Sequence, residues 1–400
     1  MKFKFPLHIH LSTLFILMTL VISGVIAGVG YQMSYNMLET SAQDLTQRAS
    51  REIAGEIKGI LGPAYTTVEL LSYHRLAYAE TPAERMASFQ VLQPALNNDA
   101  GMTSIFIGYE SGDYLFLHRI SDAEERIKYH APAGTYYQLR SIERHNGKAA
   151  AKYIYLDAGM QVLREEAHPE YAADFDPRQR GWYQSAMTAK GTVTTKPYLF
   201  FSVGKVGLTV AKRAQNGHAV IAADIPLSAL GAALRRQKVT PSSQLALVSR
   251  EGQVVAHEDL KKLIATPAMP DTPPALKNLD DFGIPALAGL AGSIATDMPP
   301  QGMSKTVELD GEDWRVSVLP IALEGSEPLY LMTAIPKKEL FATALKIRST
   351  SILITLLVIL IAMPVIWFVA RAISKSIRKL AYEAETIRLF EFAQPITLRS

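Results

Sequence analysis

Two arginines and two aromatic residues lie within one short run of the chain. Residues 175–186 read Phe-Asp-Pro-Arg-Gln-Arg-Gly-Trp-Tyr-Gln-Ser-Ala. Arg178 and Arg180 carry planar, permanently charged guanidinium groups, whose donor geometry matches that of a carboxylate. Trp182 and Tyr183 each offer an apolar surface with one polar end. These residue types predict a binding site for a small anionic ligand.

Later residues extend this candidate site. Tyr198 supplies a further aromatic wall, and Asp224 can accept a hydrogen bond from an amine or a hydroxyl group. A structural interpretation is the alternative for the first run. In it, Asp176 caps a short helix, Arg178 pairs with a local carboxylate and Trp182 belongs to the core. The sequence leaves both interpretations open.

No other chemistry has a complete set of residues. The chain has no cysteine, which excludes disulfides, thiolate nucleophiles and cysteine-ligated zinc. The histidines lack the spacing of metal ligands, and no serine lies in a Gly-x-Ser-x-Gly motif. We therefore expect no catalytic residue, no metal and no cofactor in these 400 residues. The formal charge of +3 is too small to indicate a nucleic-acid partner.

Uncharged apolar stretches lie close to both ends of the chain, at residues 11–30 and 351–370. Each has the length of about 20 residues that spans a bilayer as a helix. Basic residues lie beside the outer end of each stretch, and positive charge near a span stays in the cytoplasm. We therefore expect residues 1–10 and 371–400 to be cytoplasmic and residues 31–350 to lie outside. A cleaved signal peptide is the alternative for the first stretch, but its apolar run is too long.

A long amphipathic pattern follows the first apolar stretch. Apolar residues recur every three or four positions from Leu38 to Ile60, which predicts a helix with one buried face. Gly62-Pro63 is expected to disturb this helix, and helical character resumes to about Tyr78. The buried face fits packing against the helix's own domain and packing against a second copy equally well.

Alternating strands around short turns make up most of the remaining chain. Hairpin patterns occupy residues 103–119, 152–164, 205–225, 244–257 and 305–320, followed by a last strand at 329–335. Short helices are expected at 178–190 and 226–237. The predicted fold class is α+β, with two units of antiparallel strands on a helical stalk.

The run at 175–186 resembles the signature of the double Cache domain, an extracytoplasmic sensor module of bacteria. Lys196-Pro197-Tyr198 and the strands at 207–211 and 220–225 are also similar to this family. The resemblance covers roughly residues 43–340. It implies a long N-terminal stalk helix that carries two PAS-like antiparallel-sheet modules and is flanked by two transmembrane helices.

The resemblance also implies how the external segment is divided. A distal module is expected at about residues 80–238 and a proximal module at about 241–335, with the ligand in the distal one. The implied location is the bacterial inner (cell) membrane, crossed twice. The sensor domain would then be periplasmic or extracellular, and both termini would be cytoplasmic.

Cache domains that bind amino acids carry an Arg-x-Trp-Tyr run, then Tyr-x-Asp, then a later aspartate. Residues 180–183 match the first element, Tyr198 matches the tyrosine of the second and Asp224 matches the last. Phe200 stands where the first aspartate is expected. A buried ammonium with a single anionic partner is poorly compensated. We therefore expect a small carboxylate-type metabolite rather than specifically an α-amino acid.

An apolar seam also marks the tail after the second stretch. Ile373, Ile377, Leu380, Ala384 and Ile387 step by alternating fours and threes, as in two heptads. This resembles the first helix of a HAMP signal relay, with its connector at 389–400. The usual proline and the second helix of that relay are missing, and a plain basic juxtamembrane helix is the alternative.

These patterns predict a membrane-bound sensory receptor that acts as a homodimer. Its output domain is expected beyond residue 400 or in another chain, because the tail has neither a phosphoacceptor histidine nor a glycine-rich phosphate loop. The connector resembles, weakly, those of receptors that end in nucleotide cyclase or HD-GYP phosphodiesterase domains. The alternative function is an external binding or enzymatic domain merely anchored to the membrane.

Overall fold

The computed structural model describes most of the chain. The described residues are 7–97, 101–120, 122–145, 148–200, 205–259, 262–263, 276–288, 302–309 and 311–388. The chain divides into two units, of which one comprises residues 1–44 and 340–400 and the other residues 45–339. Each unit is considered separately.

The first unit contains two helices that are long and apolar enough to cross a membrane. One is the beginning of α1 (Leu7–Leu71), and the other is α10 (Ala342–Arg388). The apolar part of α1, Thr13–Gly30, lies within the stretch expected at 11–30. That of α10, Ile352–Glu385, contains nearly all of the stretch expected at 351–370 and extends into the residues expected to form the relay helix. Helix α10 continues through the residues expected to form a relay helix, whereas the expected connector at 389–400 lies outside the described residues.

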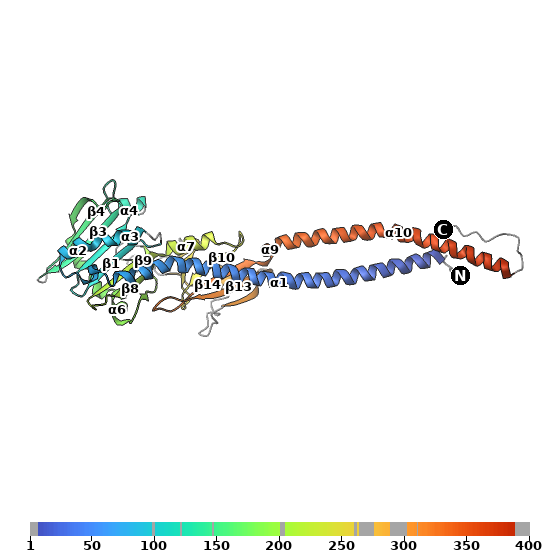
Figure 1. The fold of residues 1–400 in the computed structure, drawn as a ribbon, viewed down its shortest axis with the longest axis horizontal. Helices are drawn as coiled ribbons and strands as arrows, with labels where there is room; N and C mark the ends of the chain where they lie inside the picture. The colour runs from blue at the N-terminus through green and yellow to red at the C-terminus, as the bar shows by residue number, and fades with distance from the viewer. Residues whose placement is uncertain are drawn as a thin grey trace. The chain divides into compact units, whose positions relative to one another are not determined.

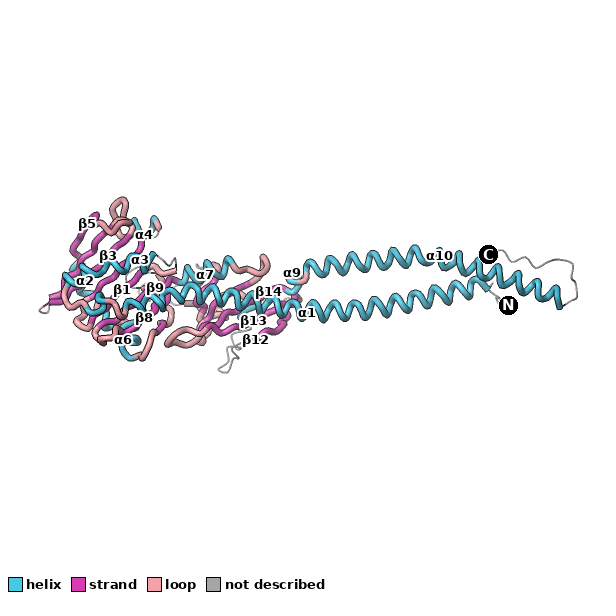
Figure 2. The backbone as a smooth tube through the Cα atoms, viewed as in Figure 1, coloured by secondary structure: helices cyan, strands magenta, loops and turns pink. Residues whose placement is uncertain are grey.

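The second unit is built on two antiparallel sheets (Figures 1 and 2). The larger sheet has nine strands in the order β5-β4-β3-β2-β1-β9-β8-β6, and β7 pairs with β8. Its strands are β1 (Ser104–Tyr109), β2 (Tyr114–Arg119), β3 (Tyr137–His145), β4 (Lys148–Leu156), β5 (Val162–Ala167), β6 (Val193–Thr194), β7 (Tyr198–Leu199), β8 (Val206–Arg213) and β9 (Ala219–Pro226). The hairpins expected here are confirmed, whereas β3 was not predicted.

Strand alternation gives this sheet two different faces. Ile105 and Ile107 of β1 point to the face covered by α1 and share a core with Ile57 and Leu61 of that helix. Phe106, which lies between these two isoleucines in the sequence, belongs to the core on the opposite face. Short helical elements cover that second face, and it is the face that bears the candidate site.

Short helices complete the distal module. They are η1 (Arg75–Tyr78), α2 (Pro82–Ser88), η2 (Phe89–Val91), α3 (Leu92–Asn97), α4 (Ala123–Lys128), α5 (Pro169–Asp174), η3 (Pro177–Gln179) and α6 (Gly181–Thr188). The expected helix at 178–190 is therefore confirmed in part, because Arg180 separates the 3-10 turn η3 from α6.

Helix α1 passes through Pro63 without interruption, which corrects the expectation of a break at Gly62-Pro63. A proline inside a helix removes one backbone hydrogen bond and costs roughly 3 kcal/mol in isolation. The neighbouring side chains of Leu61, Ala64 and Val68 are fully buried against the sheet. Burial of this face offsets the local cost, so tertiary packing overrides the sequence signal.

The smaller sheet has five strands in the order β11-β10-β14-β13-β12. Its elements are β10 (Gln244–Val248), β11 (Val254–His257), α8 (Pro285–Ala288), β12 (Met303–Leu309), β13 (Glu312–Ile321), β14 (Leu329–Pro336) and α9 (Lys337–Leu340), preceded by α7 (Leu227–Arg236). Ser50 of α1 lies 3.0 Å from the Ser317 hydroxyl of β13 and is buried. The apolar seam around Ile53 and Ile57 therefore packs within its own domain.

One short segment connects the two sheets and leads into the candidate site. The backbone N–H of Thr194 in β6 donates to the carbonyl of Glu324, at 2.9 Å. The hydroxyl of Tyr65 on α1 lies 2.7 Å from the Thr194 hydroxyl and accepts from the Glu324 N–H at 3.3 Å. This junction fixes the segment that continues to Tyr198.

Candidate functional site

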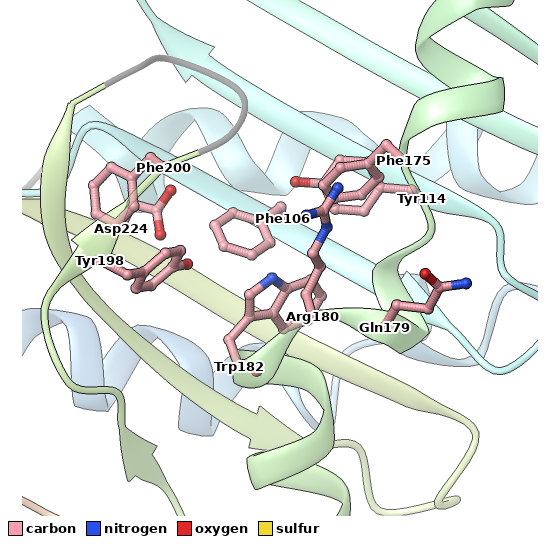
Figure 3. Close-up of a pocket in the computed structure, with 10 residues that line it drawn as sticks. Phe106, Tyr114, Phe175, Gln179, Arg180, Trp182, Tyr198, Phe200 and Asp224 are labelled. Carbon is pink, nitrogen blue, oxygen red and sulfur yellow. The ribbon is translucent and has the colours of Figure 1, made fainter. Parts of the chain in front are cut away.

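A cavity of about 220 Å³ lies on the second face of the distal sheet (Figure 3). The central strands β1, β2 and β9 supply one wall, and η3, α6 and the short strand β7 supply the other. Ten residues line it: Phe106, Tyr114, Phe175, Gln179, Arg180, Gly181, Trp182, Tyr198, Phe200 and Asp224. Aromatic rings dominate this list, and the charged side chains are a single arginine and a single aspartate.

The η3–α6 segment docks on the sheet because β1 carries a glycine at the contact. A Cβ atom at Gly108 would lie 2.8 Å from Pro177 and 2.9 Å from Trp182, so a larger residue cannot stand there. The Asp176 side chain accepts from the Arg178 N–H at 2.9 Å and caps η3. The close approach and the cap together hold Arg180 and Trp182 over the sheet.

Arg180 forms the cationic end of the cavity. Its guanidinium lies 4.6 Å from the centre of the Phe175 ring and donates to the Asp174 carbonyl at 3.4 Å. Figure 3 shows the guanidinium beside Phe175 and Tyr114, facing the space between the two walls. A permanently charged fork on an aromatic surface is suited to hold a carboxylate.

The middle of the cavity is aromatic. Trp182 packs edge-on against Phe106, with ring centres 4.9 Å apart, and is only 4% exposed. Tyr114 and Phe175 have ring centres 4.6 Å apart. These contacts make the middle of the site rigid and apolar, so that a small carbon skeleton can be buried there.

Asp224 forms the anionic end. Its carboxylate accepts from the Thr209 hydroxyl at 2.6 Å and from the Ser104 hydroxyl at 3.1 Å. The Tyr198 hydroxyl lies 2.6 Å from Thr209 Oγ1, so that four polar side chains form one chain of hydrogen bonds. The carboxylate keeps lone pairs for an amine or a hydroxyl group in the cavity.

Burial controls the charge of Asp224. The side chain is 3% exposed, and desolvation raises its pKa to about 7, although the Thr209 and Ser104 hydrogen bonds oppose this rise. The carboxyl is thus protonated much more readily than an ordinary aspartate, whose pKa is 3.8. Its charge therefore responds to pH and to a cationic group placed beside it.

Phe200 closes the cavity next to Asp224. Its ring packs on the backbone of Gly207, where a Cβ atom would lie 2.1 Å from the ring. The ring is 2% exposed and lies edge-on to Tyr198, with ring centres 5.3 Å apart. An apolar wall thus occupies the position where a second acidic group was expected from the resemblance.

The structure brings together four of the six predicted site residues. Arg180, Trp182, Tyr198 and Asp224 all line the cavity. Arg178 does not line it, because its guanidinium pairs with Asp176 at 2.7 Å, as the structural alternative proposed.

Tyr183 does not line the cavity either. It is buried behind Trp182, with ring centres 5.7 Å apart. Arg178 and Tyr183 therefore support the wall of the site, whereas Arg180 and Trp182 form its surface.

Sequence reasoning missed the lining residues on β1 and β2, Phe106 and Tyr114. Strand alternation could have shown that these two residues share one face of the sheet. Phe106 pairs with Phe116 in the β1–β2 ladder, and Tyr114 lies on the same face. Choosing which face bears the cavity needs the position of α6, which the alternation does not give. Among the described residues, no group of three or more His, Cys, Asp or Glu side chains is placed to hold a metal ion.

Two antiparallel sheets along one helix, with a cavity that has an arginine at one end and an aspartate at the other, define an α+β domain with a candidate small-molecule site. The comparison with known families agrees. The model of the double Cache domain, described as "Cache domain", matches residues 35–344. The chain therefore belongs to the Cache domain family.

Curated relatives align with different shares of this chain. Adenylate cyclase 1 of Rhizobium meliloti (strain 1021) is 26% identical over 401 residues, which cover 98% of this chain and 58% of that protein. The methyl-accepting chemotaxis protein PscA of Pseudomonas syringae pv. tomato is 39% identical over 95 residues, which cover 23% of this chain and 15% of that protein. The chain thus spans only part of the length of these relatives.

Solved structures also resemble the chain. The ligand-binding domain of the Pseudomonas aeruginosa PAO1 amino acid chemoreceptor PctB in complex with L-Arg matches with a TM-score of 0.47 and 18% identity. The match covers 75% of this chain and 97% of that domain.

The pKa of Asp224 predicts how stability depends on pH. Because the folded state binds this proton more tightly than the unfolded chain, Asp224 favours folding below pH 4 and loses that effect as pH rises to about 7. We compare the free energy of unfolding of ligand-free Asp224→Asn with that of wild type. This difference should be ~1–4 kcal/mol more favourable to the variant at pH 8 than at pH 4.5. Melting temperatures of both proteins across this range measure the difference.

Asp176→Asn is the matched control for this experiment. Its hydrogen bond with Arg178 lowers the pKa of the Asp176 carboxyl, so this carboxyl is ionised in both the folded and the unfolded state from pH 4.5 to 8. The stability difference between Asp176→Asn and wild type should therefore stay nearly constant over this range. A stability difference for Asp224→Asn that does not change with pH would contradict the assignment of a near-neutral pKa.

Proposed function

We propose that this chain is the input part of a membrane-bound sensory receptor that binds a small carboxylate-type metabolite outside the cytoplasm. The observation that carries the proposal is the distal cavity, with Arg180 at one end and Asp224 at the other. It lies within a Cache domain, which supports a sensory role.

The cavity suggests how the ligand is held. The carboxylate would pair with the Arg180 guanidinium, and the carbon skeleton would lie against the aromatic surface that Phe106 and Trp182 form together. A hydroxyl or amine group would reach Asp224. Because Phe200 replaces a second acidic group, we expect an amine to add little affinity.

Membrane insertion is the second part of the proposal. The apolar windows of α1 and α10 have the length and composition to span a bilayer, which supports a two-pass protein of the bacterial inner membrane. Basic residues at Lys2, Lys4, Arg371 and Lys375 favour cytoplasmic termini. The Cache domain would then be periplasmic or extracellular.

Signal relay through a homodimer is the third part. Along α10 after residue 370, Ile373, Ile377 and Leu380 are 41%, 44% and 45% exposed. Their heptad spacing would let two copies of the helix pack in parallel, as in a HAMP relay. A ligand would act by favouring one of two packing states of this pair.

The output is proposed to be a nucleotide cyclase, with an HD-GYP phosphodiesterase as the alternative. The alignment with adenylate cyclase 1 covers nearly the whole chain, including the tail beyond the Cache domain, and this supports the cyclase. We expect the coding sequence downstream of codon 400 to encode a cyclase domain, whose product forms cyclic nucleotide in isolated membranes. If that downstream sequence encoded an HD-GYP phosphodiesterase domain instead, the cyclase proposal would be wrong and the alternative output would be correct.

The binding proposal predicts a ligand-dependent increase in melting temperature. We expect at least one small carboxylate in a metabolite panel to stabilise the full chain in detergent, by about 2.7 kcal/mol at a concentration of 100 times its dissociation constant. Arg180→Ala should abolish this shift, because it removes the cation at the cavity. Arg178→Ala is the control and should retain the shift, since Arg178 pairs with Asp176 outside the cavity. An unchanged shift in Arg180→Ala would contradict the site.

The relay proposal predicts a pattern of cross-links. The chain has no cysteine, so single introduced cysteines report their own positions. In membranes we expect efficient disulfide formation between copies for Ile377→Cys and Leu380→Cys, and little for Lys375→Cys and Tyr382→Cys. Uniform cross-linking around the helix, or none at any position, would leave a simple membrane anchor as the better interpretation.

A further inference from the structure

Tyr114 presents its hydroxyl to the cavity. The side chain lines the cavity and is only 2% exposed, and no hydrogen bond joins its hydroxyl to any residue that the structure describes. Among the described residues, the hydroxyl is not one of the fully enclosed polar atoms that lack a partner, so it is open to the cavity itself. It can therefore donate to a molecule bound there.

Other buried tyrosines of the same module differ in this respect. Tyr109 donates to the Leu76 carbonyl at 2.8 Å, and Tyr155 donates to the Tyr129 carbonyl at 2.8 Å. Neither of them lines the cavity. Tyr114 thus differs from these two tyrosines in that its hydroxyl faces the cavity.

The Tyr114 hydroxyl is also held in place. Its ring contacts Phe106, Phe116 and Phe175, with ring centres 5.9, 6.0 and 4.6 Å away. Figure 3 shows the hydroxyl pointing from this packed ring into the cavity. Burial raises the pKa of Tyr114 well above its usual value, so the group stays protonated and can donate.

A second donor faces the same space. Figure 3 shows the indole nitrogen of Trp182 turned toward the middle of the cavity, and no described residue accepts its hydrogen. Tyr114 and Trp182 both pack on the Phe106 ring, while Tyr114 and the Arg180 guanidinium both pack on the Phe175 ring. Two neutral donors and one cation thus surround one region. A group with only acceptor atoms, such as a carboxylate, fits there.

We propose that Tyr114 binds the metabolite directly, by donating its phenolic hydrogen to the carboxylate that Arg180 holds. This inference rests on the proposed function and adds a specificity-determining residue to the site. A carboxylate offers only acceptors to Tyr114, Trp182 and Arg180. The isosteric amide would place an N–H₂ donor against one of these donors, so the site should reject it.

The test compares Tyr114→Phe with Tyr155→Phe in the full chain in detergent. The probes are butanoate, its 2-hydroxy and 2-amino derivatives, and butanamide, each titrated by calorimetry at up to millimolar concentration. Melting temperatures of the ligand-free proteins are measured in parallel. Tyr155→Phe removes a satisfied hydroxyl outside the cavity and serves as the matched control.

We expect the two variants to differ in opposite ways in melting temperature and in affinity for the acids. Tyr114→Phe should melt at the wild-type temperature, because the hydroxyl makes no hydrogen bond with a described residue, and should bind the acids about 10- to 100-fold more weakly. It should also lose preference for butanoate over butanamide. Tyr155→Phe should melt at a lower temperature and keep wild-type affinity.

Three results would overturn the inference. The inference fails if Tyr114→Phe binds the acids as tightly as wild type does. It also fails if the melting temperature of Tyr114→Phe falls as that of Tyr155→Phe does, since that fall would reveal a structural partner. Failure of wild type to bind any of the acids would remove carboxylate recognition itself, and with it the proposed function. The first two results would leave the proposed function standing and refute only the role of Tyr114.

Discussion

Alternation of side chains across a single layer of strands is the constraint on which this domain depends. Ile105 and Ile107 pack toward α1, while Phe106, between them, lies on the face that bears the cavity. A one-residue slip in β1 would exchange these roles and destroy both faces at once. The same thin layer therefore packs against α1 on one side and forms the floor of the candidate site on the other.

The sequence predicted the parts of the site that lie close together along the chain or match a known signature. Arg180, Trp182, Tyr198 and Asp224 were named from residue type and spacing, and all of them line the cavity. Tyr114 was missed because its role depends on which face of β2 meets α6, and strand periodicity cannot tell two apolar faces apart.

Long-range packing explains the remaining differences. Pro63 signals a break in α1, yet the buried neighbours on that helix keep it continuous. Arg178 and Arg180 have the same side chain and are two positions apart, but the Asp176 cap turns only the first away from the cavity. Which of two such arginines faces a ligand is decided by a single local carboxylate, and composition does not reveal this choice.

The buried Asp224 carboxyl has a thermodynamic consequence for any molecule that enters the cavity. The pKa of Asp224 is about 7. Binding of a molecule in the cavity and protonation of this carboxyl therefore influence each other. A cation beside the carboxylate expels the proton, whereas an uncharged or anionic neighbour favours its retention. The heat of binding measured by calorimetry would then depend on the ionisation enthalpy of the buffer. The fraction of domains with an occupied cavity would depend on pH as well as on the concentration of the bound molecule.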